Sequence, residues 1–126
     1  MNKTLTFFLL PVLFGCLYAQ KIDKEDLYKT WYLDKYSDEA QYYPPPKKEM
    51  GDYIRLNSDM TYTAITQGES DSGTWVLNTN GTYLELKSAD DHIEKMYIYF
   101  LSTRSLVVVY DVDEHRAWEV HYVSGT

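Results

Sequence analysis

The sequence predicts an all-β fold, an eight-stranded up-and-down antiparallel β-barrel. Seven segments after residue 50 alternate apolar with polar side chains, and turns rich in Gly, Asn, Asp or Ser separate them. An eighth segment, which contains Trp31, precedes them. No connection is long enough for a crossover helix, which excludes a parallel sheet. A barrel of this size is filled by its own side chains or holds one small ligand.

Residues 1–19 resemble an export signal and lie outside the predicted domain. Lys3 supplies the positive start, and the apolar stretch that follows is too short for a permanent membrane anchor. Cleavage after Ala19 leaves Gln20 as the N-terminus and residues 20–126 as one domain, 107 of the 126 residues.

A second interpretation treats residues 13–16 as a lipobox, in which Cys16 carries lipid and anchors the protein to a membrane. Without lipid on Cys16, no membrane partner is expected. Both interpretations place the protein outside the cytoplasm, in the periplasm or the extracellular space.

Composition limits how the domain is stabilised and what it binds. Cys16 is the only cysteine, so no intrachain disulfide is possible and the core must supply the stability. The formal charge is −7, and it becomes −8 when Lys3 is removed with the signal. An acidic domain repels phosphate backbones, so nucleic acid is not an expected partner.

The chain is expected to begin with one short helical turn at residues 22–28, in which Ile22 and Leu27 cover one end of the barrel. The first strand follows at residues 28–36. Residues 38–50 break the alternation, because the three prolines at 44–46 cannot donate to a β-ladder. The remaining strands are expected at residues 53–57, 61–67, 73–77, 82–87, 93–101, 106–112 and 116–123.

Hairpin connections alternate between the two ends of such a barrel. One end collects the short turns near residues 57–60, 78–81 and 102–105, and Trp31 is expected near this floor. The other end collects residues 38–50, 68–72, 88–92 and 112–116, which are longer on average. This second end is the predicted mouth.

Several motifs resemble, in order and spacing, the small secreted lipocalin-like domains of bacteria. The resemblance rests on residues 29–31 (Lys-Thr-Trp), 53–62, 72–77, 80–86 and 97–106. Lys29 and Met60 stand where the family usually has Gly. Lipocalins also commonly place a basic residue against the floor tryptophan late in the barrel, and no Arg or Lys follows Arg116. The resemblance implies a lipocalin/calycin-like barrel that binds a small hydrophobic or amphipathic molecule non-covalently.

Alternation defines the interior if Trp31, Trp75 and Trp118 point inward. The same rule turns further residues inward: Leu33, Leu86, Ile98, Leu106 and Val120. The residues expected to contact a ligand share this direction: Ile54, Leu56, Tyr62, Ala64, Trp75, Leu77, Leu84, Phe100, Val108, Tyr110, Trp118 and Tyr122. In the alternative interpretation these side chains fill the barrel, and the protein is an interaction or envelope-structural module.

The predicted mouth is acidic, which disfavours anionic ligands and favours neutral or cationic ones. Asp90-Asp91-His92 and Asp113-Glu114-His115 repeat an acid-acid-His order. Two histidines with carboxylates can bind a divalent metal, but solvated hairpin turns explain the pattern more simply. We therefore expect no metal and no other cofactor.

Tyr42 and Tyr43 precede the prolines and offer a lid over the mouth, although a solvated loop is the simpler interpretation. Catalysis has little support, because the sequence contains no Gly-rich phosphate loop and no nucleophile elbow. His121 is expected to face opposite Val120 and Tyr122. The sequence therefore predicts a protein that is not an enzyme.

Overall fold

The computed structural model describes residues 21–80, 82–111 and 118–125. The expectations for the export signal, including Lys3, Cys16 and Ala19, lie outside the described residues. The same holds for Asp113-Glu114-His115 and for the first residues of the last predicted strand.

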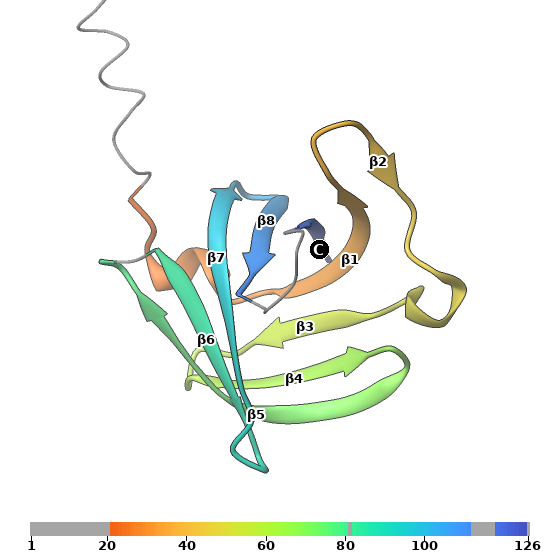
Figure 1. Ribbon diagram of the computed structural model, residues 1–126. Coiled ribbons are helices and arrows are strands. Elements are labelled where there is room, and N and C mark those ends of the chain that lie inside the picture. The colour runs from red at the N-terminus through yellow and green to blue at the C-terminus, as the bar shows by residue number, and fades with distance from the viewer. Residues whose placement is uncertain (1–20, 81, 112–117, 126) are drawn as a thin grey trace, which may run out of the picture.

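Eight antiparallel strands close around a common interior (Figure 1). They are β1 (Thr30–Ser37), β3 (Tyr53–Leu56), β4 (Thr61–Thr66), β5 (Glu69–Asn78), β6 (Tyr83–Ser88), β7 (Ile93–Leu101), β8 (Ser105–Tyr110) and β9 (Glu119–Ser124). Each strand pairs with the next, and β9 pairs back onto β1. A two-residue strand, β2 (Tyr42–Tyr43), adds to the end of β1. The predicted eight-stranded barrel is confirmed.

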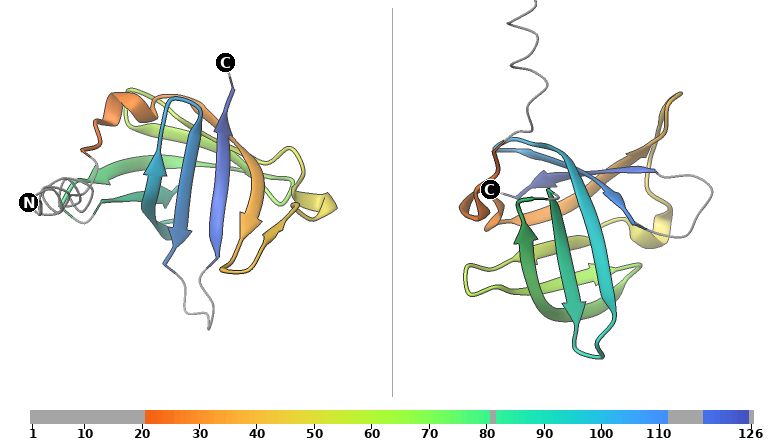
Figure 2. Two further views of the ribbon diagram at one scale, coloured as in Figure 1. Left: turned by 90° about the horizontal axis from the view of Figure 1, so that it is seen from above. Right: turned by 60° about the vertical axis from the view of Figure 1, so that its left-hand side comes forward.

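Two short 3₁₀ helices, η1 (Lys24–Leu27) and η2 (Lys47–Glu49), lie at opposite ends of the barrel (Figure 2). Leu27 of η1 is fully buried, and its carbonyl accepts a hydrogen bond of 3.2 Å from Nε1 of Trp31, which is also fully buried. Helix η1 thus covers the floor, as the sequence predicted.

A lysine, Lys29, lies against the floor tryptophan Trp31, although the sequence has no Arg or Lys after Arg116. Lys29 Nζ lies 5.4 Å from the centre of the Trp31 ring and donates a hydrogen bond of 2.7 Å to the carbonyl of Thr103. A basic residue therefore lies against the floor tryptophan, and it comes from the position just before β1.

Met60 adopts a left-handed backbone conformation, with φ at 71°, in the turn between β3 and β4. Such a conformation favours Gly, which explains the residue usual in the family. Two contacts to Trp75 secure the turn: its backbone N–H donates to the Met60 carbonyl at 2.9 Å, and its Nε1 donates to the Asn57 carbonyl at 3.1 Å.

Strand alternation places most predicted interior residues correctly. The buried ones are Ile54, Leu56, Tyr62, Ala64, Trp75, Leu84, Leu86, Ile98, Leu106, Val108, Val120 and Tyr122. Together with η1 they form one continuous core.

The prediction for Phe100 is wrong, because its side chain is 51% exposed on the outer face. The pairing of β7 with β8 shifts register between Ile98 and Phe100. Such a bulge adds one residue to a strand and reverses the direction of the side chains beyond it. Leu101 therefore takes the buried position instead.

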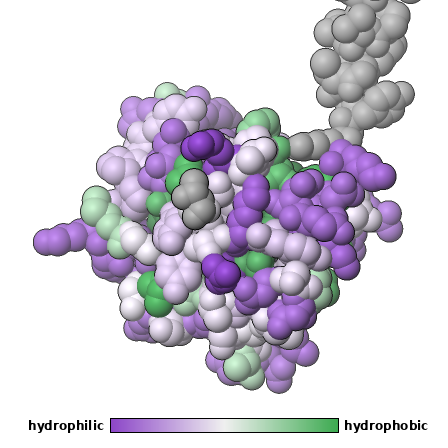
Figure 3. Space-filling view, turned by 180° about the vertical axis from the view of Figure 1, so that it is seen from behind, coloured by the Kyte–Doolittle hydropathy of each residue, from purple (hydrophilic) through white to green (hydrophobic). Residues whose placement is uncertain are grey.

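Apolar side chains on the outer surface in Figure 3 are scattered among polar ones. The exposed large residues come from several strands and include Tyr42, Val76, Ile93, Tyr99 and Phe100. No helix in the described part of the chain has the length and apolar character needed to cross a membrane.

Gly73 marks a close approach of the β5 backbone to β6. A Cβ at this position would lie 1.9 Å from the backbone carbonyl oxygen of Lys87. Since the obstructing atom belongs to the backbone of a paired strand, no side-chain rotation relieves the clash.

Gly73→Ala is therefore expected to lower the free energy of unfolding by roughly 2–4 kcal/mol, because the two strands must separate locally. Denaturant unfolding measures the change. The neighbouring exposed Ser72→Ala serves as the control and should stay within about 0.5 kcal/mol of the parent. Equal stability of the Gly73 variant and the parent would contradict this account of the strand packing.

Candidate functional site

A cavity of about 210 Å³ occupies the half of the barrel near the predicted mouth. The half near the floor is packed with side chains that do not line it, among them Trp31, Trp75, Leu84 and Val108. A dry cavity of about 150 Å³ is large enough to hold benzene. The space therefore matches a molecule of about one aromatic ring with a short substituent.

The walls of the cavity include apolar side chains from six strands. They are Leu33 on β1, Ile54 on β3, Ala64 on β4, Leu86 on β6, Met96 on β7 and Val120 on β9. Because paired strands hold their backbones, this part of the cavity is formed before any ligand enters.

Tyrosine hydroxyls and carboxylates supply most of the polar lining. Tyr36 donates to Oε1 of Glu49 at 2.5 Å, and Tyr62 donates to Oδ2 of Asp71 at 2.9 Å. The hydroxyls of Tyr110 and Tyr122 lie 2.6 Å apart, and either oxygen can be the donor.

These four tyrosines keep their protons at neutral pH. Burial raises the pKa of Tyr110 to about 12. Burial also raises the pKa values of Tyr36, Tyr62 and Tyr122, and the hydrogen bonds of Tyr36 to Glu49 and of Tyr62 to Asp71 act in the same direction. The hydroxyls are therefore neutral hydrogen-bond donors.

Asp52 is a buried carboxylate with a structural task at the mouth. Its Oδ2 accepts from the backbone N–H of Gln67 at 2.7 Å, and its Oδ1 accepts from that of Gly68 at 3.3 Å. Both residues have positive φ, at 54° and 81°. Through these two hydrogen bonds, Asp52 stabilises the tight turn between β4 and β5, which lies at the mouth of the barrel.

The structure places the predicted ligand-contacting residues in two groups of five, with Phe100 and Trp118 outside both. Those that line the cavity are Ile54, Tyr62, Ala64, Tyr110 and Tyr122. Those outside the cavity lining but in the core or packed against it are Leu56, Trp75, Leu77, Leu84 and Val108. Phe100 is on the outer face, as described above, and Trp118 is the remaining residue.

Trp118 does not line the cavity. It precedes β9, and its half-buried ring packs edge-on against Tyr43 with the ring centres 5.1 Å apart. The expected inward direction came from extending the alternation of β9 to a residue outside the strand.

Several lining residues were not among the predicted contacts, notably Tyr36, Glu49, Glu94 and Met96. Alternation from Ile98 along β7 points to Met96 and Glu94. Alternation from Trp31 and Leu33 did not predict Tyr36, because the pairing of β1 with β9 shifts register between Leu33 and Lys35. Glu49 lies on η2, and strand periodicity carries no information about a helix in a connection.

The segment from Tyr42 to the prolines does not cover the mouth. The Tyr42 ring, 64% exposed, meets His121 edge-on with the ring centres 5.6 Å apart. The Tyr43 hydroxyl donates to Asp38 at 3.0 Å. Since neither tyrosine lines the cavity, the idea that they form its lid is wrong.

Within residues 21–80, 82–111 and 118–125, no three His, Cys, Asp or Glu side chains gather as metal ligands would. In the turn before β7, Asp90 accepts a short hydrogen bond from Ser88, and His92 lies 3.9 Å from Glu94. These contacts are those of a hairpin turn.

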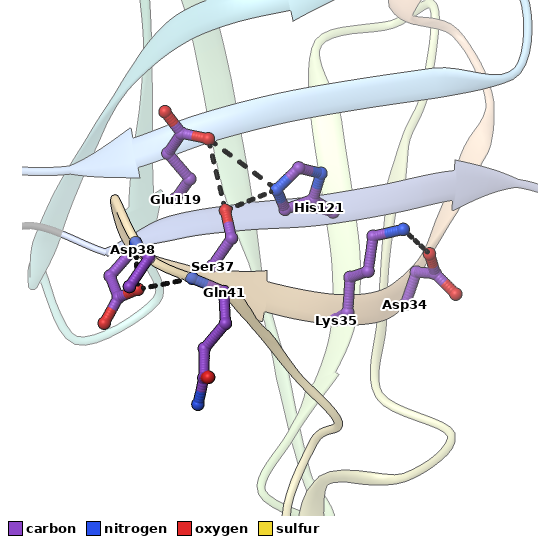
Figure 4. Close-up of polar contacts among 8 residues, drawn as sticks. Asp34, Lys35, Ser37, Asp38, Gln41, Glu119 and His121 are labelled. Carbon is purple, nitrogen blue, oxygen red and sulfur yellow. Dashed lines mark hydrogen bonds and ion pairs between the residues drawn. The ribbon is translucent and has the colours of Figure 1, made fainter.

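A Ser-His-Glu cluster lies outside the cavity, at the pairing of β1 with β9 (Figure 4). Ser37 Oγ is 2.8 Å from Nε2 of His121 and donates to Glu119 at 3.2 Å. A catalytic triad needs the acid on the other ring nitrogen and an accessible hydroxyl. Here Glu119 also faces Nε2, at 3.7 Å, and Ser37 is only 4% exposed. The cluster joins the two strands that close the barrel.

The sequence comparisons agree with this architecture. A family model described as a lipocalin-like domain matches residues 27–108, well over half of the chain. The chain belongs to the lipocalin-like domain family. The search of curated proteins found no match. Members of this family are generally binding proteins rather than enzymes.

In this lipocalin-like protein, the cluster at the closing strands predicts a pH dependence of stability. Burial, with Lys35 nearby, lowers the pKa of His121, so the folded state favours the neutral ring. The unfolded chain then binds more protons than the folded one as pH falls below about 6.5, and stability declines over this window. His121→Gln keeps a polar group near Ser37 and should remove this part of the decline.

Thermal unfolding between pH 7 and 5 measures the effect, and His92→Gln, which removes an exposed imidazole, is the control. The control should retain the decline of the parent. A decline that is the same in the His121 variant and the parent would contradict the assignment.

Proposed function

We propose that this lipocalin-like protein binds a small hydrophobic or amphipathic molecule non-covalently in the cavity near the mouth. The observation that carries the proposal is the unfilled space of about 210 Å³, walled by apolar side chains and by tyrosine hydroxyls. Apolar walls favour the transfer of a ligand from water, and a few fixed polar groups orient it. No chemical change of the ligand is part of the proposal.

The alternative, an interaction module with a filled barrel, gains no support from the interior. Side chains fill the half of the barrel near the floor, but the half near the mouth contains the cavity. The exposed apolar residues of the described chain are spread over several strands and do not mark one docking face.

Ala64 provides a direct test of the cavity, because its small side chain lies on the wall. Ala64→Leu fills part of the space, and Ala64→Val fills less of it. The folded parent should bind phenethyl alcohol, a neutral probe with one aromatic ring, in a saturable way in isothermal titration calorimetry. We expect weaker binding in the Val variant and at least about tenfold weaker binding in the Leu variant.

The matched control is Thr63→Leu, an exposed position next to Ala64 on β4. It should bind the probe as the parent does. Circular dichroism verifies that each variant is folded. Absence of saturable uptake by the parent, or uptake unchanged by both Ala64 variants, would reject the cavity as the binding site.

We further propose that the protein is exported by the signal in residues 1–19 and acts in the periplasm or the extracellular space. The apolar stretch after Lys3 and the small residue Ala19 support this proposal. The intact mass of the protein from its own host tests it. We expect the mass of a chain that starts at Gln20. A chain that starts at Cys16 and carries the additional mass of a diacylglyceryl group would instead show that the protein is lipid-anchored. An unprocessed chain would reject both.

A further inference from the structure

The lining of the cavity is acidic in the part of the chain that the structure describes. Four carboxylates line it, namely Glu49, Asp52, Asp71 and Glu94, and no Lys or Arg lies among its lining residues in the described chain. They come from η2, from the residue before β3, from β5 and from β7, so they surround the space from several sides.

Hydrogen bonds hold these carboxylates without cancelling their charge. Tyr36 donates to Glu49, Tyr62 and the backbone N–H of Ser72 donate to Asp71, and backbone N–H groups donate to Asp52. All of these donors are neutral. Glu94 lies 3.9 Å from His92, an exposed residue that also lines the cavity. Both oxygens of Asp52 are taken up by the turn at Gln67 and Gly68. A cation entering the cavity would therefore meet the other three carboxylates, on Glu49, Asp71 and Glu94, and no Lys or Arg of the described lining compensates them.

The raised pKa values of Tyr36 and Tyr62 point to the same negative field. Burial is the largest cause, and Glu49 acts on Tyr36, while Asp71 and Glu94 act on Tyr62. A field that opposes the formation of tyrosinate favours a positive charge in the same place.

The Tyr110–Tyr122 pair is a second polar feature of the cavity, and its hydroxyl oxygens can accept hydrogen bonds from a ligand. Tyr122 is 6% exposed, and its hydroxyl shares one hydrogen bond with that of Tyr110. Two hydroxyls joined by one bond leave one O–H proton unused, and no further acceptor contacts the pair among the described residues. The unused O–H proton needs an acceptor, which a water molecule in the cavity can supply, whereas a protonated amine has no lone pair and can only donate to the hydroxyl oxygens of the pair.

The remaining lining suits the body of an organic cation. Five tyrosines contribute rings, namely Tyr36, Tyr53, Tyr62, Tyr110 and Tyr122, and aromatic rings attract ammonium groups. Leu33, Ile54, Met96 and Val120 offer apolar contact to an uncharged part. The volume limits that part to about one ring and a short chain.

We propose that the preferred ligand is a small organic cation, a protonated amine joined by a short link to one aromatic ring. The inference rests on the proposed function, since it assigns the ligand class of the same cavity. The ring lies among the apolar walls and the ammonium group among the carboxylates of Glu49, Asp71 and Glu94.

Three compounds of nearly equal size separate charge from shape: phenethylamine, phenethyl alcohol and phenylacetate. Each is titrated into the parent protein at neutral pH and low salt, and isothermal titration calorimetry measures its affinity. We expect phenethylamine to bind at least about fivefold more tightly than the alcohol, and phenylacetate to bind most weakly. The advantage of the amine should shrink as salt is added.

Substitutions of lining carboxylates test whether these groups provide the preference for the amine. Asp71→Asn and Glu94→Gln should each weaken phenethylamine about threefold while leaving the alcohol nearly unchanged. The control is Glu69→Gln, which removes an exposed carboxylate of β5 that does not line the cavity and should change neither affinity.

The outcomes distinguish the two proposals. Equal binding of amine and alcohol, or tighter binding of phenylacetate, would overturn the assignment of a cation while leaving small-molecule binding intact. An amine preference that survives both lining variants would also overturn it, because the charge would then act elsewhere. Failure of the parent to bind any of the three compounds would reject the proposed function itself.

Discussion

The pairing of β9 with β1 is the constraint on which the rest of the structure depends, because it closes the sheet and fixes the width of the interior. Within that width, the buried side chains of Trp31 and Trp75 fill much of the interior near the floor. Helix η1 covers that end, and Lys29 lies over the Trp31 ring while it donates to the carbonyl of Thr103. The space left over lies towards the mouth, so the cavity is a consequence of where the large side chains sit.

Closure also determines which polar groups meet. The register shift in β1 turns Tyr36 towards the cavity, where it reaches Glu49 of η2. On the other side of the same pairing, Tyr122 of β9 meets Tyr110 of β8. Neutral donors thus fix carboxylates around a small hollow, which keeps their charge available to a ligand. Its apolar walls and carboxylates make the cavity complementary to the amphipathic cation that we propose as its ligand.

Sequence periodicity was sufficient for the barrel, because alternation and turn residues report local backbone geometry that tertiary packing preserved. It also placed Ile54, Ala64 and Tyr122 on the cavity wall. It failed where a ladder is irregular, as at the bulge that exposes Phe100. Glu49 could not be predicted, because its position depends on how a long proline-containing connection returns to the barrel. Whether large side chains fill an interior depends on three-dimensional packing, which alternation alone does not report.

The central claim is that the mouth half of the barrel is a cavity that admits a small aromatic amine. Methyl NMR of the methionines tests it most directly, since Met96 lines the cavity whereas Met50 is exposed and Met60 does not line it. Titration with phenethylamine should shift the Met96 methyl signal in a saturable way and leave the signals of Met50 and Met60 in place. An unmoved Met96 signal at saturating amine would contradict the account.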